Sequence, residues 1–305
     1  MIFDRMPELD RVIAEALQYF ERSGCRPRLR VSVSGGRTSA RMAWLIKLHL
    51  SAYFDIVFLF ANTSREHPDT LRFVHDLDQN LGLNLVWLEA VVHYGIEKSC
   101  THRVVDFATA KRNGEVFEAY VAKYGLPNQV FKNCTRELKT NPMKSYSDSI
   151  GWTAGSFLTA IGIRADERRR VSDKAAAQSI VYPLAQWWPM DKQDVLDFWE
   201  PIPWDLAIEE REGNCIDCHK KSDKKLALLA KEHPEYFVFP VMLDRLYENV
   251  GPNNVPGPRR RYRGYMSTEQ KLASFEGVDV SRIVDDAASG GCTESCELYE
   301  TELIS

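Results

Sequence analysis

Residues 34–39, which read Ser-Gly-Gly-Arg-Thr-Ser, join an apolar stretch directly to a helical pattern. Glycines let a backbone approach a ligand closely, and a helix start offers free N–H groups and the positive end of its dipole. Ser34 and Ser39 add hydroxyl donors. The stretch is neither a Rossmann GxGxxG motif nor a GxxxxGK(S/T) motif. It predicts a loop that holds a phosphate or pyrophosphate, and a tight turn with a serine cap is the alternative.

The chain contains seven cysteines, and two of them, Cys215 and Cys218, form a CxxC motif preceded by Gly213 and Asn214. Such a pair places two thiolates on one ion or cluster, or forms a redox couple. Cysteines in a chain without an export signal are typically thiols, metal ligands or redox groups rather than disulfides.

The elements around the glycine-rich loop predict an open α/β sheet. We expect strands at 29–34, 55–61, 83–90, 156–163 and 179–184, and helices within 1–25 and at 39–50, 67–82, 115–125, 135–150 and 190–200. Strand–helix–strand order implies a parallel sheet with right-handed crossovers. The loop would then lie at the carboxyl end of the first strand, where open α/β sheets bind ligands.

The composition divides the chain into four parts. We expect an N-terminal helix (1–25), a ligand-binding α/β domain (26–200), a mostly helical region with the CxxC motif (201–284) and a tail (285–305). The tail holds six acidic residues and no basic one, which is typical of a surface tail or a lid.

Charge and hydropathy favour a cytoplasmic protein. The net charge of -4 argues against a general polyanion binder, and 44% hydrophobic with 27% charged residues is typical of a globular protein. No run of eighteen apolar residues occurs, and acidic residues interrupt the apolar pattern of the N-terminus. We therefore expect neither a membrane span nor a signal peptide.

Several motifs together resemble the phosphoadenosine phosphosulfate (PAPS) reductase-like branch of the adenine-nucleotide α-hydrolase superfamily. The loop is similar to the SGGxxS pyrophosphate loop of that superfamily. The other matching motifs follow in the family order: FLFANTSREHPDTLRFV (58–74), CTRELKTNPM (134–143), GIRADERRR (162–170), YPLAQW (182–187) with DVLDFW (194–199), and GNCIDCHKKS (213–222). The resemblance spans roughly residues 29 to 230 and is strongest to a subgroup found in phage and prophage genomes.

The resemblance implies a Rossmann-like parallel sheet with helices on both faces and a nucleotide, ATP or PAPS, at the loop. The phosphates would be held by Ser34, Gly35, Gly36, Thr38 and Ser39. Asn62 and Thr63 would lie near the adenosine. Many ATP-using members carry an aspartate where this chain has Thr38, so a carboxylate that would serve Mg²⁺ is missing from the loop.

The same resemblance implies catalytic roles for three basic residues. Arg164 would reach the phosphate or the transferred group from the end of the fourth strand. Arg136 and Lys139 are one helical turn apart, so they would present two charges to one anion.

The resemblance also implies a metal site on Cys134, Cys215 and Cys218. Cys292 or Cys296 of the tail would supply a fourth ligand, or the site would stay open for an incoming sulfur atom. A 4Fe–4S cluster fits this count, and zinc fits it equally, because ligand number does not separate the two.

Three functions follow from these features. In the first, ATP is cleaved between its α- and β-phosphates, an acceptor is adenylated, and sulfur replaces AMP. In the second, a sulfonucleotide is reduced through a nucleophilic Cys296; in the third, the chain is a regulator without catalysis. A sulfur donor or reductant protein would be a partner. The segment PRRRYRGY (258–265) predicts a single-strand nucleic-acid patch or a structured loop against the acidic tail.

Overall fold

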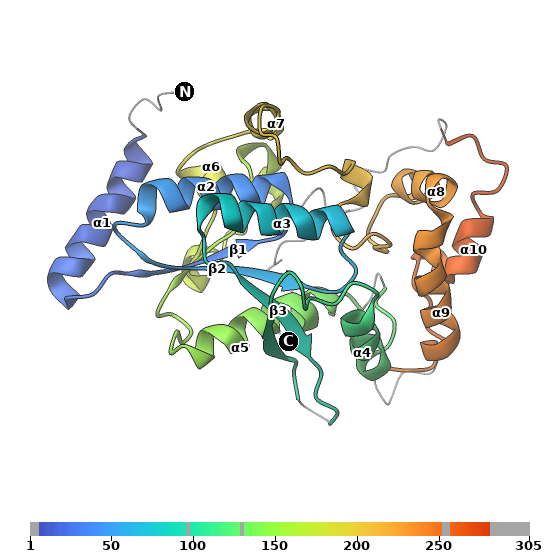
Figure 1. Ribbon diagram of the computed structural model, residues 1–305. Helices are drawn as coiled ribbons and strands as arrows, with labels where there is room; N and C mark the ends of the chain where they lie inside the picture. The colour runs from blue at the N-terminus through green and yellow to red at the C-terminus, as the bar shows by residue number, and fades with distance from the viewer. Residues whose placement is uncertain (1–5, 96–97, 129–130, 252–256, 281–305) are drawn as a thin grey trace.

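The computed structural model describes residues 6–95, 98–128, 131–251 and 257–280. Within them one six-stranded sheet has the order β4-β3-β2-β1-β5-β6 (Figure 1). The strands are β1 (Arg28–Val33), β2 (Asp55–Asn62), β3 (Val86–Val91), β4 (Thr101–Val105), β5 (Leu158–Ala160) and β6 (Ile180–Val181). All paired strands are parallel except β3 and β4, which run antiparallel.

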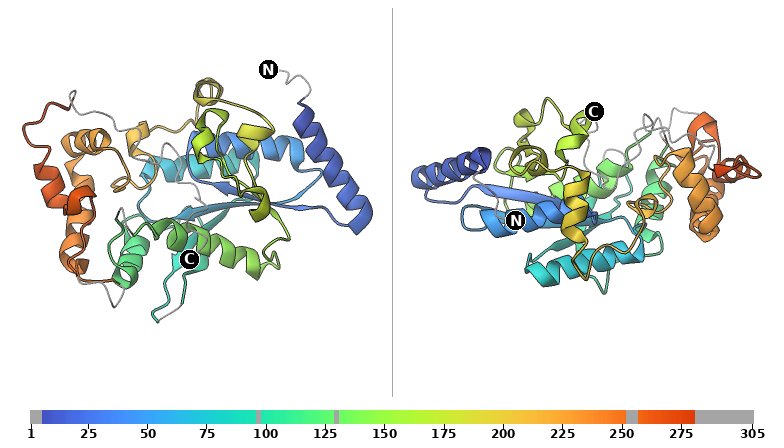
Figure 2. Two further views of the ribbon diagram at one scale, coloured as in Figure 1. Left: turned by 180° about the vertical axis from the view of Figure 1, so that it is seen from behind. Right: turned by 90° about the horizontal axis from the view of Figure 1, so that it is seen from above.

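Helices cover both faces of the sheet. Helices α2 (Arg37–Leu50) and α3 (Pro68–Leu81) lie on one face, and α4 (Glu115–Tyr124) and α5 (Asn141–Ser149) lie on the other (Figure 1). The remaining helices are α1 (Pro7–Ser23), α6 (Pro183–Gln186), α7 (Lys192–Trp199), α8 (Asp223–Glu232), α9 (Val238–Tyr247) and α10 (Thr268–Ala273). Figure 2 shows α8, α9 and α10 as a helical region beside the end of the sheet opposite α1.

Apolar side chains on the central strand and its flanking helices build the main core. Leu29 and Val31 of β1 are fully buried, as are Met42 and Ile46 of α2. A strand buried on both faces is expected at the centre of a parallel sheet covered by helices. This core fixes β1, and therefore the loop that follows it.

The predicted fold class is confirmed: a mostly parallel α/β sheet with helices on both faces, followed by a mostly helical region that carries cysteines. The antiparallel edge strand β4 was not among the expected strands. Its alternating pattern is weak, since none of its five side chains is fully buried. The segment 285–305 lies outside the described residues.

The chain order places a topological switch point next to the glycine-rich loop. From β1 the chain proceeds to β2 and β3 on one side, and β5 and β6 lie on the other side of β1. Ligands bind at such points in open α/β sheets, outside the carboxyl ends of the strands. Among the described residues, no helix is long and apolar enough to cross a membrane.

Candidate nucleotide and cysteine site

The glycine-rich loop turns sharply from β1 into α2. Gly35 has φ +87°, a left-handed conformation, and a Cβ there would lie 2.6 Å from Cγ2 of Thr70. Gly36 is the N-cap residue of α2, so no side chain at that position caps the first amides of the helix. Gly35 therefore favours glycine, whereas Gly36 has an extended backbone that any residue adopts, and the N-terminus of α2 opens toward the turn.

The two serines of the loop bind each other. The Ser39 hydroxyl accepts a hydrogen bond from the Ser34 amide at 3.0 Å and lies 2.9 Å from the Ser34 hydroxyl. It also donates to the Gly36 carbonyl at 3.0 Å. Thr38 and Ser39 are fully buried. These two residues shape the loop from behind, while Ser34, Gly35 and Gly36 face the cavity in front.

That cavity, here called the loop cavity, is closed on the far side by residues 206–214. It is lined by Ser34, Gly35, Gly36, Arg37, Thr70, Leu206, Ile208, Glu209, Glu210, Gly213 and Asn214. A bidentate ion pair anchors segment 206–214 to the loop. Arg37 Nε and Nη2 donate to the two carboxylate oxygens of Asp205, at 2.7 and 2.8 Å. Trp199 of α7 donates from Nε1 to the Arg37 carbonyl at 3.0 Å.

Glu210 brings a carboxylate to the loop cavity, but two lysines neutralise it. Lys192 donates to one of its oxygens at 2.6 Å and Lys225 to the other at 2.7 Å. Burial opposes the ionisation of Glu210, yet these two hydrogen bonds outweigh it and lower its pKa to about 2. The carboxylate is therefore charged at neutral pH.

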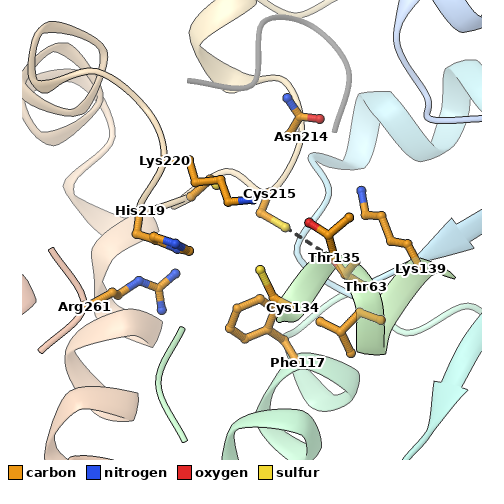
Figure 3. A pocket seen from close by; sticks show the side chains of 12 residues that line it. Thr63, Phe117, Cys134, Thr135, Lys139, Asn214, Cys215, His219, Lys220 and Arg261 are labelled. Carbon is orange, nitrogen blue, oxygen red and sulfur yellow. Dashed lines mark hydrogen bonds between the residues drawn. The ribbon is translucent and has the colours of Figure 1, made fainter. Parts of the chain in front are cut away.

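The second cavity, here called the cysteine cavity, lies beside the first and shares Asn214 with it. It is lined by Thr63, Phe117, Cys134, Thr135, Leu138, Lys139, Asn214, Cys215, Cys218, His219, Lys220 and Arg261. Figure 3 shows the thiols of Cys134 and Cys215 facing this space.

The CxxC turn is attached to the end of β2. Cys215 pairs with Glu66 in an isolated antiparallel bridge, and the Ile216 amide donates to the Arg65 carbonyl at 2.9 Å. The Thr63 hydroxyl lies 3.4 Å from the sulfur of Cys215. The sheet thus places these thiols at its carboxyl edge, next to the loop.

A buried charge cluster supports the same turn. Asp217, the third residue of the CxxC motif, is fully buried and lies 3.4 Å from Nη2 of Arg65 and 3.2 Å from Nη2 of Arg261. Burial opposes its ionisation, but the two guanidinium groups keep the pKa of Asp217 below its ordinary value. Sequence reasoning missed all three residues, although the position of Asp217 inside the motif was visible.

His219 follows the motif and is neutral at physiological pH. Burial, reinforced by the positive charges of Arg261 and Lys220, lowers the pKa of His219 well below its usual range. The cations of the cysteine cavity are therefore lysine and arginine.

The structure separates the three residues with predicted catalytic roles. Lys139 lines the cysteine cavity and lies 3.9 Å from Glu66. Arg164 lies behind the loop and donates to Thr38 Oγ1 at 3.2 Å. Arg136 donates to Glu137 and lines neither cavity. The three do not converge on one cavity.

The two residues expected near the adenosine also differ in position. Thr63 lines the cysteine cavity. Asn62 is fully buried, and its amide donates to Glu89 at 2.8 Å and to the Lys111 carbonyl at 2.8 Å. Asn62 therefore supports the end of β2 from inside the protein.

Cys134, Cys215 and Cys218 line one cavity, as a shared site requires. No three His, Cys, Asp or Glu side chains among the described residues are grouped closely enough to hold a single metal ion. Cys292 and Cys296 lie outside the described residues.

The basic segment 258–265 is partly buried, while Tyr265 is 79% exposed. Arg259, Arg261 and Tyr262 are 6%, 1% and 3% exposed. Arg261 contacts Asp217 of the CxxC turn, and the expected contact with the acidic tail lies outside the described residues.

The fold defines a doubly wound α/β protein with a glycine-rich loop at the switch point. The chain is 32% identical over 283 residues to the uncharacterized nin region protein ORF290 of Escherichia phage lambda, covering 90% of this chain and 96% of that protein. It belongs to the family of this phage protein. No protein-family model matches the chain.

Three solved structures share parts of the fold at low identity. PAPS reductase of Candida auris is 14% identical with a TM-score of 0.35, over 66% of this chain and 88% of that one. The NH3-dependent NAD synthetase of Campylobacter jejuni is 14% identical with a TM-score of 0.39, over 78% and 87%. The U34-tRNA thiolase NcsA of Methanococcus maripaludis, with its 4Fe–4S cluster, is 14% identical with a TM-score of 0.36, over 82% and 83%.

Proposed function

We propose that this protein is an enzyme of the adenine-nucleotide α-hydrolase superfamily, in its PAPS reductase-like branch, that uses ATP to transfer sulfur. One observation carries the proposal: a cavity walled by the glycine-rich loop and a cavity lined by three thiols adjoin at Asn214. Sulfur transfer through an adenylated acceptor needs these two functions side by side.

The loop would hold the pyrophosphate of ATP. The N-terminus of α2 and the backbone of Gly35 and Gly36 offer N–H groups, and Ser34 offers a hydroxyl. Positioning and neutralisation of the leaving pyrophosphate supply most of the catalysis in this chemistry. Mg²⁺ would enter with the nucleotide. Arg164 acts on the loop from behind through Thr38, as a positioning residue.

The cysteine cavity would hold the sulfur-handling group. We assign Cys134, Cys215 and Cys218 as ligands of a 4Fe–4S cluster, with Cys292 as the fourth ligand. Three soft thiol donors around one cavity suit such a cluster. Zinc fits less well, because Zn–S bonds of about 2.3 Å require tightly converging thiolates. Where Cys292 does not ligate, the fourth iron of the bound cluster would be open to a sulfur atom. Lys139 offers a positive charge at the cavity wall.

The test measures nucleotide binding and pyrophosphate release with anaerobically purified, iron-replete full-length protein. We expect ATP to bind and pyrophosphate to be released. Gly36→Asp should abolish binding, because it places a carboxylate where the anion lies. Gly82→Asp is the control for a general loss of stability, because its φ of +56° strains the backbone but the position lies outside both cavities.

Other outcomes identify the competing functions. Sulfite release from PAPS without pyrophosphate release from ATP would establish a reductase. Tight nucleotide binding without turnover would establish a regulator. Equal ATP binding by Gly36→Asp and the unsubstituted protein would overturn the loop assignment.

A further inference from the structure

The cysteine cavity is strongly cationic. Lys139, Lys220 and Arg261 line it, and no carboxylate appears among its lining residues. Lys220 and Arg261 are 8% and 1% exposed. Positive charges gathered in a buried space favour an anion as the ligand of that space.

Arg261 carries hydrogen-bond donors that the described protein does not use. Its Nη2 donates to the backbone and the carboxylate of Asp217, at 3.1 and 3.2 Å. Its Nε and Nη1 have no hydrogen-bond partner in the described part of the chain. Buried donors are nearly always satisfied, so these two point to a ligand. Figure 3 shows the guanidinium extending toward Cys134 and Phe117.

Two carboxylates act on this guanidinium: Asp217 in direct contact, and Asp244 through its charge. Asp217 is shared between Arg65 and Arg261, so one carboxylate serves two cations. Arg65 also packs over the ring of Phe239, 4.3 Å from its centroid. An anion beside Arg261 would accept hydrogen bonds from its two unused donors.

The remaining lining of the cysteine cavity consists mainly of polarisable sulfur atoms and apolar side chains. The sulfurs of Cys134, Cys215 and Cys218, with Phe117 and Leu138, supply it. A ligand that matches both parts needs an oxyanion end for the cations and a sulfur end for the thiol side.

We propose that the cysteine cavity binds a small inorganic sulfur anion of the thiosulfate class. Its oxyanion end contacts Arg261 and Lys220, and its terminal sulfur faces the side of the cavity where the three cysteines lie and would hold their cluster. The proposal rests on the proposed function, for which it names the sulfur source, but the binding itself requires neither ATP nor turnover.

Titration calorimetry of the full-length protein with thiosulfate tests the site, with sulfate as the probe that lacks the terminal sulfur. We expect thiosulfate to bind and sulfate to bind about tenfold more weakly or worse. Arg261→Lys keeps the positive charge but removes the planar guanidinium with its several N–H donors. It should weaken thiosulfate binding by about tenfold, as expected for charge-assisted hydrogen bonds. Arg260→Lys is the matched control, because Arg260 pairs with Glu248 at 2.7 Å and does not line the cavity.

A second variant tests the anion site independently, in case Arg261→Lys does not fold. Lys220→Met should weaken binding similarly, with Lys224→Met as its control, and circular dichroism reports the folded state of each. In protein freed of metal, bound thiosulfate should also slow alkylation of Cys134, Cys215 and Cys218, measured by mass spectrometry.

The failures of the two proposals are distinguishable. Unchanged thiosulfate binding in folded Arg261→Lys and Lys220→Met would overturn the anion site, and equal binding of sulfate would overturn its preference for sulfur. Either result leaves ATP binding at the loop intact. Loss of ATP binding by the unsubstituted protein would overturn the proposed function alone, while thiosulfate still bound.

Discussion

Arg164, which follows β5, donates a hydrogen bond to the Thr38 hydroxyl in the first turn of α2 at 3.2 Å. Thr38 is fully buried, and Arg164 is 5% exposed. The bond joins the two sides of the switch point, because Arg164 follows β5, α2 follows β1, and these two strands are neighbours in the sheet. Arg164 is itself held by Asp166, whose carboxylate accepts from Nε at 2.9 Å. The loop therefore rests on a fixed cation.

Thr38→Val should destabilise the protein by about 1–2 kcal/mol, because it leaves a buried guanidinium donor without this acceptor. Urea unfolding measures the change. Thr70→Val is the control, since Thr70 Oγ1 is buried and has no hydrogen-bond partner in the described chain, so its loss should be neutral or stabilising. Equal losses in both variants would show that the Arg164 bond contributes nothing.

Gly35→Ala should cost more stability than Gly151→Ala. Both glycines have left-handed φ values, +87° and +77°, which cost an alanine about 1–2 kcal/mol. Only at Gly35 does a Cβ meet a neighbour, Cγ2 of Thr70 at 2.6 Å. Thermal unfolding compares the variants, and ATP affinity should fall only in Gly35→Ala. Matching unfolding temperatures would mean that Thr70 moves aside without cost.

Asp217→Asn should destabilise the protein by about 3–5 kcal/mol, because it leaves two buried guanidinium groups without their carboxylate. Asp223→Asn is the control: its ion pair with Lys271 is half exposed on the aspartate side, and its loss should cost under about 1 kcal/mol. Denaturant unfolding at pH 7 checks both. A small effect at Asp217 would mean that solvent reaches the cluster.

The contribution of Glu210 should depend on pH in a defined direction. Its folded pKa of about 2 lies below the ordinary 4.5, so the ionised carboxylate stabilises the fold fully above pH 4.5. That stabilisation is lost as the pH falls from 4.5 toward 2. The difference in unfolding temperature between the unsubstituted protein and Glu210→Gln should be constant above about pH 5 and shrink below it. A difference that grows in acid contradicts this assignment.

The parts of the fold that follow from local patterns were predictable. The strand 55–61 is an apolar run, and β2 extends over Asp55–Asn62. The helix at 190–200 was expected near Asp191, which caps α7 in the structure by accepting from the Asp194 amide. The strand at 156–163 shrinks to Leu158–Ala160, because its pairing with β1 covers only three residues.

In the candidate site, too, contiguous motifs could be predicted from the sequence, whereas contacts between distant residues could not. The loop at 34–39 and the CxxC motif are contiguous in sequence, so their chemistry could be predicted. The charge cluster joins Arg65 to Asp217 across 152 positions, and no local pattern encodes that contact. The basic segment 258–265 has the composition of a surface, but tertiary packing buries Arg259 and Arg261.

The charge cluster also sets an order of events during synthesis. A growing chain emerges from its N-terminus, and its earlier parts fold first. Asp217 follows Arg65 by 152 positions, and Arg261 follows Asp217 by another 44. The sheet can therefore be complete while the CxxC turn still lacks one of its two cations. A chain that stops before residue 261 would keep its glycine-rich loop, but Asp217 would lack the Arg261 contact, so the CxxC turn reaches its final set of contacts only in the nearly finished protein.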